Sequence, residues 1–152
     1  MKIVKASLVA AIALVGSSAA MAQSASTNAN FSVSTEILKF CKVSAQSIVI
    51  APITAGDTTA TGDKSSTGGV LVNCTNQTGY TLKVTDSLNL AHDGTNYQIP
   101  TSLALNTTSG TGAGFGNGTA KSHVVTATIP QAAYENAVAG AYTATTTVTL
   151  TY

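Results

Sequence analysis

The stretch from Tyr142 to Tyr152 constrains the fold more than any other part of the sequence. Its residues alternate between two sets, one of which is entirely threonine, while the other holds Tyr142, Ala144, Thr146, Val148, Leu150 and Tyr152. A period of two with many β-branched residues predicts a β-strand. The strand is expected to run to the last residue, which leaves a sheet edge with no following strand to cover it. Such an edge is a template for pairing with another chain.

Other short periodic or apolar segments predict further strands. These segments are residues 31–37, 38–43, 47–50, 69–74, 80–85, 97–99, 103–105 and 122–129. Composition predicts loops over 54–69 and 107–119, and one short helical turn within 130–139. Seven or eight short strands with turn signals between them and no long helix predict an all-β sandwich.

The first 22 residues predict a secretory signal peptide. Lys2 and Lys5 precede an apolar run over residues 6–15, which is short for a membrane span, and residues 20–22 read Ala-Met-Ala. We expect cleavage between Ala22 and Gln23 and export of the mature chain. A retained N-terminal anchor is the alternative.

Composition argues against a nucleic-acid partner. Residues 23–152 carry five lysines, six acidic residues and no arginine, which is a net charge near −1. A nucleic-acid binder needs a basic stripe to neutralise phosphates, and scattered lysines do not supply one. Low charge with many threonines instead suits an exported β-protein with hydroxyl-rich faces.

Cys41 and Cys74 are the two cysteines of the chain. An even pair in an exported protein predicts one disulfide. Two free buried thiols are the alternative, and a metal site is disfavoured because no histidine lies at a ligand-like spacing.

No enzyme signature is found, so the chain is predicted to be a non-enzyme without a cofactor, a metal or a small-molecule substrate. His92 is expected in an exposed turn and His123 at an edge or surface. The glycines between Gly110 and Gly118 do not have the spacing of a nucleotide-binding loop, and a strand rather than a helix follows them. Asp57 and Asp63 do not fit the offsets of an EF-hand.

The two ends of the mature chain suggest a way to assemble. Residues 29–35 alternate between apolar and polar types and could act as a strand that the domain itself does not need. A spare strand at one end and an uncovered edge at the other predict head-to-tail polymerisation by β-strand addition. The contact is heterologous and does not close, so it builds a filament.

The chain also resembles a known family. The features that carry the resemblance are the signal peptide, the alternating extension, Cys41 after it, Cys74 within VLVNCTNQTGYTLKV, and the ending IPQAAYENAVAGAYTATTTVTLTY. Together they resemble the spore coat protein U domain family, which includes the subunits of archaic chaperone–usher pili. Gly140, Tyr142, Val148 and Tyr152 match the family's closing pattern, whereas Ala144 stands where the family has an acidic residue.

The resemblance implies an incomplete immunoglobulin-like β-sandwich that lacks its last strand and is completed by donor-strand complementation. It divides the chain into a signal peptide (1–22), a donor-strand extension (23–36) and a pilin domain (37–152). Mapped onto this sequence, the donor residues are Ala29, Phe31, Val33 and Thr35, and the groove and chaperone-facing residues are Tyr142, Val148, Leu150 and Tyr152. The implied partners are identical or related pilin subunits, a periplasmic chaperone and an outer-membrane usher. The implied location is a cell-surface pilus with a role in adhesion or biofilm formation.

The alternative interpretation is a self-complete secreted β-sandwich that binds carbohydrate or protein. It requires residues 29–37 to pair within their own domain. Tyr80, Tyr97 and Tyr134 could stack on a sugar in place of tryptophan, which the chain lacks. A secreted hydrolase is the third possibility.

Overall fold

A computed structural model describes residues 26–56 and 61–152 of the chain, which separates into two compact units, Met1–Thr35 and Glu36–Tyr152. In the first unit, the described residues 26–35 form neither strand nor helix. The side chains of Phe31 and Val33 are 87% and 84% exposed. The predicted signal peptide, with Ala22 and Gln23, lies outside the described residues.

The second unit is an all-β structure. Its described residues form nine strands and one four-residue helix: β1 (Cys41–Ala45), β2 (Lys64–Cys74), β3 (Gly79–Val84), β4 (Ser87–His92), β5 (Gln98–Leu105), β6 (Ser109–Thr111), β7 (Lys121–Ile129), α1 (Gln131–Tyr134), β8 (Tyr142–Thr143) and β9 (Val148–Thr151). The all-β prediction is confirmed. The helical turn predicted within 130–139 is confirmed as α1, which Pro130 precedes in an extended conformation.

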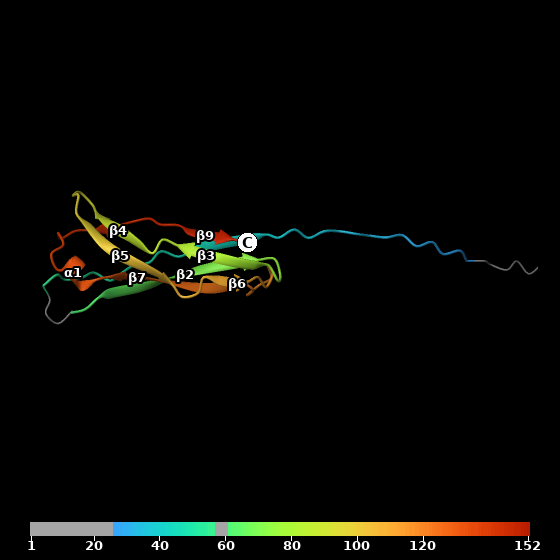
Figure 1. The fold of residues 1–152 in the computed structure, drawn as a ribbon, viewed down its shortest axis with the longest axis horizontal. Helices are drawn as coiled ribbons and strands as arrows, with labels where there is room; N and C mark the ends of the chain where they lie inside the picture. The colour runs from blue at the N-terminus through green and yellow to red at the C-terminus, as the bar shows by residue number, and fades with distance from the viewer. Residues whose placement is uncertain (1–25, 57–60) are drawn as a thin grey trace, which may run out of the picture. The chain divides into compact units, whose positions relative to one another are not determined.

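The strands form two antiparallel sheets (Figure 1). The larger sheet has six strands in the order β1-β2-β7-β5-β4-β8, and the smaller has three in the order β6-β3-β9. The strands β1, β8 and β9 therefore lie at sheet edges. Figure 1 shows β3 and β9 side by side, with α1 at the opposite end of the second unit from the label C.

One shared core joins the two sheets. It contains buried residues of β2 and β7 from the larger sheet and of β3 from the smaller, among them Val70, Val72, Leu82 and Val125. A second, smaller cluster consists of Ile99 at the start of β5, Ile129 at the end of β7 and Tyr134 at the end of α1. Buried residues alternate with exposed ones along β3 and with half-buried ones along β7, as expected for strands with one face on a core.

The predicted loop over 54–69 is wrong in its second half, because β2 begins at Lys64. Residues 64–68 are rich in serine, threonine and glycine, but each pairs with a residue of β7, from Lys64 opposite Ile129 to Gly68 opposite Val125. The pairing with an apolar neighbour strand, rather than local composition, fixes this segment as a strand.

Three further predictions about strands need correction. β4 was not predicted, and β5 runs without a break through Pro100, where it pairs with β4 but not with β7. β6 lies within the predicted loop over 107–119. No strand forms over residues 31–40 or 47–50, and the first strand begins at Cys41.

The final alternating segment is two short strands rather than one. β8 pairs with β4 in the larger sheet, and β9 pairs with β3 in the smaller sheet. Residues 144–147 cross between the sheets without strand pairing. Tyr142, Val148 and Leu150 are nevertheless half-buried on one side, and the threonines between them are exposed.

Candidate functional site

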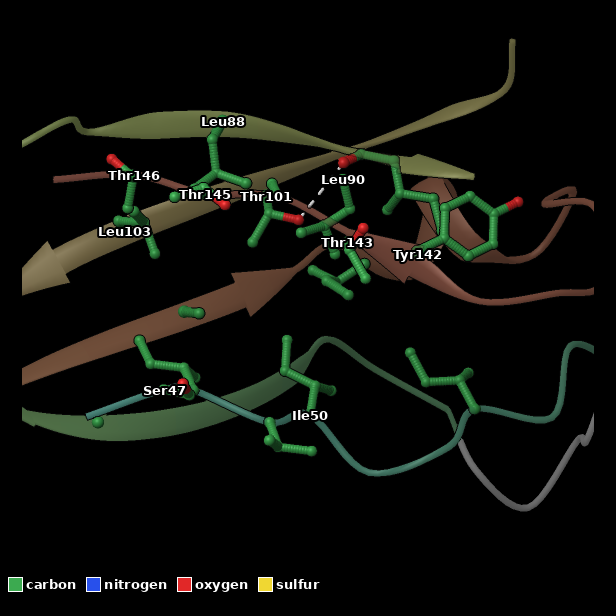
Figure 2. Close-up of a pocket in the computed structure, with 18 of the residues that line it drawn as sticks. Ser47, Ile50, Leu88, Leu90, Thr101, Leu103, Tyr142, Thr143, Thr145 and Thr146 are labelled. Atoms are coloured by element: carbon green, nitrogen blue, oxygen red, sulfur yellow. Dashed lines mark hydrogen bonds between the residues drawn. The ribbon is translucent and has the colours of Figure 1, made fainter. Parts of the chain in front are cut away.

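A groove of about 870 Å³ is open along the second unit. One wall is the segment from Ala45 to Pro52, and another consists of residues 142–146 together with Val148. In Figure 2, Ser47 and Ile50 lie across the groove from Leu88, Leu90 and Thr143. Among the described residues that line it, none carries a charge.

The floor of the groove is the protein core itself. Its lining includes residues that are almost fully buried, namely Val70, Val84, Ile99, Thr101, Leu103, Val125, Ala127, Ile129 and Tyr134. Around them, Ile48, Ile50, Leu88 and Val148 pack against the core but stay only half-buried. The groove is therefore a side of the core that none of the described strands covers.

The first wall continues from the edge strand β1. The amide of Gln46 donates to the carbonyl of Gly69 at 2.8 Å, which keeps the chain beside β2 for one residue past β1. Ile48 then lies over Gly68, where a Cβ atom would come within 2.6 Å of Ile48 Cγ1. The glycine lets the wall approach β2 closely, so the side chain of Ile48 reaches the core.

The second wall is held at Tyr142. The Tyr142 hydroxyl donates to the carbonyl of Val138 at 2.7 Å, and its ring meets the rings of His92 and Tyr97 edge-on, with centroids 5.0 and 6.3 Å away. Burial raises the pKa of Tyr142, and the neighbouring Tyr97 raises it further. His92, predicted in an exposed turn, is instead the last residue of β4, and its Nε2 lies 3.1 Å from the carbonyl of Ala139.

Edge strands on both sides and an apolar floor define what the groove can accept. β1 and β8 end the larger sheet and β9 ends the smaller one, so each has a side without a neighbouring strand in the described chain. An unpaired strand edge offers backbone donors and acceptors to an incoming strand. An extended segment with apolar residues at every second position satisfies both the edges and the floor.

The Cys41–Cys74 disulfide is present, so this prediction is confirmed. The two cysteines lie opposite each other in the β1–β2 register. The bridge fastens the first residue of the edge strand β1 to the buried end of β2.

His123 is buried, not at an edge or surface as predicted. It lies on β7 between β2 and β5 and is 4% exposed. Its Nε2 is 2.8 Å from the Tyr80 hydroxyl, and its Nδ1 is 2.7 Å from the Thr107 hydroxyl. Burial raises the pKa of Tyr80. These hydrogen bonds satisfy the polar groups of the buried Tyr80 and His123 and end at the exposed Thr107.

The predicted site residues fall in different places. Tyr142 and Val148 line the groove, whereas Leu150 packs on the core from β9 and Tyr152 follows β9 and is 52% exposed. The predicted donor residues Ala29, Phe31, Val33 and Thr35 belong to the first unit and are exposed. The structure adds a wall and a floor that sequence reasoning missed: Ala45–Pro52, Leu88, Leu90, Thr101 and Leu103. The alternation of Leu88 and Leu90 with polar neighbours was the available signal for β4.

Comparisons with protein-family models, curated proteins and solved structures find no match to this chain. The described residues contain no group of three or more His, Cys, Asp or Glu side chains placed to hold a metal ion. Within the same residues, none of the helices has the length and apolar character needed to cross a bilayer.

Proposed function

We propose that this protein is a structural subunit of a surface pilus and that its second unit is an incomplete immunoglobulin-like β-sandwich. The missing strand is supplied by residues 29–35 of the next copy, which lie in the groove. The observation that carries the proposal is that the uncovered side of the core lies between strand edges that pair with no other strand in the described part of the chain.

The chain contains a segment suited to that groove. Residues 26–35 carry no charge, as the groove lining carries none, and Phe31 and Val33 stand on the same side of an extended chain. Both side chains are more than four-fifths exposed, so their burial in a neighbour removes apolar area from water. Each contributes about 1.5–3 kcal/mol when fully buried, and the backbone ladder adds to this.

A groove whose floor is the protein core makes an unassembled subunit prone to aggregation. An exposed apolar face with unpaired strand edges promotes aggregation. This favours the partners that the family resemblance implies. A periplasmic chaperone fills the groove during export. At an outer-membrane usher, the donor strand of the next subunit then replaces the chaperone in the groove. Adhesion or biofilm formation at the cell surface is the role we propose for the filament.

The test compares two charge substitutions one residue apart. Val33→Asp places a carboxylate in the apolar groove, where burial of an unpaired charge is strongly unfavourable. Ser32→Asp places the same charge on the opposite side of the strand. The mature protein from periplasm is examined by gel electrophoresis in detergent with and without boiling, and by electron microscopy. We expect the unchanged chain and Ser32→Asp to give thin filaments and a ladder that boiling collapses, and Val33→Asp to give neither.

A ladder from Val33→Asp as strong as that from Ser32→Asp would overturn the donor assignment. A single monomer band from the unchanged chain, unaffected by boiling and without filaments, would overturn the pilus proposal. It would favour a self-complete secreted protein with the groove as a ligand site.

A further inference from the structure

Two aromatic rings meet on the surface beside the disulfide. Phe40 precedes Cys41, and Phe115 lies in the glycine-rich segment between β6 and β7. Their ring centroids are 5.7 Å apart, yet the side chains remain 52% and 47% exposed. We name Phe40 and Phe115 the aromatic pair.

Hydrogen bonds fix Phe40 in place. Its amide donates to the Thr75 hydroxyl at 2.8 Å, and its carbonyl accepts from the Thr75 amide at 2.9 Å. The loop that carries Phe115 is also anchored, because the amide of Gly114 donates to the carbonyl of Cys74 at 2.9 Å. Thr119 donates to the carbonyls on either side of Phe115, those of Gly114 and Gly116, each at 2.7 Å. The pair is thus a preorganised feature of the second unit.

The neighbouring residues extend the apolar character towards the donor segment. Ile37 and Leu38 are 81% and 72% exposed. A flexible linker between a donor strand and its domain is typically polar, whereas residues 36–40 contain three large apolar residues, Ile37, Leu38 and Phe40. Rigid, half-exposed aromatic side chains are typical of the centre of a protein–protein interface.

The covalent chain limits how far the aromatic pair can lie from a neighbouring subunit. If residues 29–35 occupy a neighbour's groove, residues 36–40 join that groove to Phe40. Five extended residues span at most about 18 Å. The surface around the groove's end is therefore within reach of the pair whenever the donor strand is inserted.

We propose that the aromatic pair forms a second contact between successive copies of this chain, against the groove end at Val138. This inference rests on the proposed function. Each paired strand in the described chain is antiparallel to its neighbour, so the donor strand is taken to add antiparallel to β9. It then leaves the groove where β8 begins, beside Val138, which is 45% exposed between two alanines of the lining. The contact makes each joint of the filament a fixed angle instead of a free hinge.

Tryptophan fluorescence tests the contact, because the chain contains no tryptophan of its own. Phe115→Trp places a probe in the aromatic pair. Leu71→Trp is the matched control, since Leu71 is 39% exposed on β2 between two buried valines and so points away from the core. Filaments of each full-length variant are compared by emission maximum and by acrylamide quenching. We expect blue-shifted, weakly quenched emission from position 115 and strong quenching from position 71.

Equal quenching at the two positions in filaments that form normally would overturn the second contact and leave the proposed function standing. A failure of both variants and of the unchanged chain to form filaments would overturn the proposed function instead. Val138→Ser in the Phe115→Trp background tests the counterpart surface without adding a charge to the groove lining. We expect stronger acrylamide quenching at position 115 in the filaments of this variant, and protected emission that is unchanged would refute the placement at Val138.

Discussion

Phe31→Ala should weaken the filament without weakening the subunit. Phe31 is 87% exposed, so its truncation removes little buried apolar area from the subunit. In the proposed filament the same ring is buried in a neighbour's groove. Ser32→Ala is the matched control, because it alters the same strand on its outward side.

The expected magnitude follows from the burial of one phenylalanine. Truncation of a buried phenylalanine to alanine costs about 3–5 kcal/mol when the surroundings do not close over the cavity. The groove is open and can partly relax, so the lower value, about 3 kcal/mol, is the better expectation. At 1.36 kcal/mol per factor of ten, this corresponds to roughly 150-fold faster strand release.

The assay follows strand release over time. Filaments are held in detergent at a fixed temperature below boiling, samples are withdrawn at intervals, and the decay of the gel ladder gives a rate for each variant. Thermal unfolding of the subunit in the same preparations shows whether the domain itself has changed. Equal rates for Phe31→Ala and Ser32→Ala would refute the argument that Phe31 anchors the donor strand.

Three further predictions concern the second unit. Replacement of Cys41 and Cys74 by serine should lower the free energy of unfolding by about 3–4 kcal/mol, because the bridge closes a loop with a sequence separation of 33; an unchanged urea midpoint would contradict it. Gly68→Ala should destabilise by about 1–3 kcal/mol through overpacking against the wall, whereas Gly79→Ala, with no atom within 4 Å, should not. Equal urea midpoints for these two variants would count against the close approach at Gly68. Burial raises the pKa of Tyr80, so the native state keeps its proton where the unfolded chain loses it. The contribution of Tyr80 to stability should therefore be constant below about pH 10 and fall above it, and Tyr80→Phe should make the fall of stability in urea titrations shallower.

Strands whose pattern is local were predictable from the sequence. The apolar residues alternate with polar ones throughout β3 and from Val125 to Ile129 in β7, so each strand could be recognised without knowledge of its neighbours. The disulfide was predictable because the chain has two cysteines and a signal peptide pattern. Short helical character after Pro130 was predictable from the absence of alternation there.

The parts that depend on distant pairing were not predictable. The first half of β2 is a strand because β7 pairs with it, although its composition is typical of a loop. The last segment passes from the larger sheet at β8 to the smaller sheet at β9. The alternation of residue types in its sequence continues through this change of sheet, so a single strand was expected. The wall at Ala45–Pro52 has four consecutive apolar residues, Ile48 to Ala51, and a proline, and its position follows from the space above Gly68.

The disulfide lies where a filament of this design would carry tension. A pull on a donor strand passes along residues 36–40 to Cys41, the first residue of β1. β1 is an edge strand that pairs with β2 alone, so without a crosslink the pull could separate it from the sheet. The bridge passes the force directly to Cys74, at the end of a strand that pairs with β7 along most of its length. The hydrogen bonds between Phe40 and Thr75 act at the same point. The cysteine replacement should therefore weaken filaments under load more than its effect on the isolated domain predicts, because it removes the connection between the tether and the core.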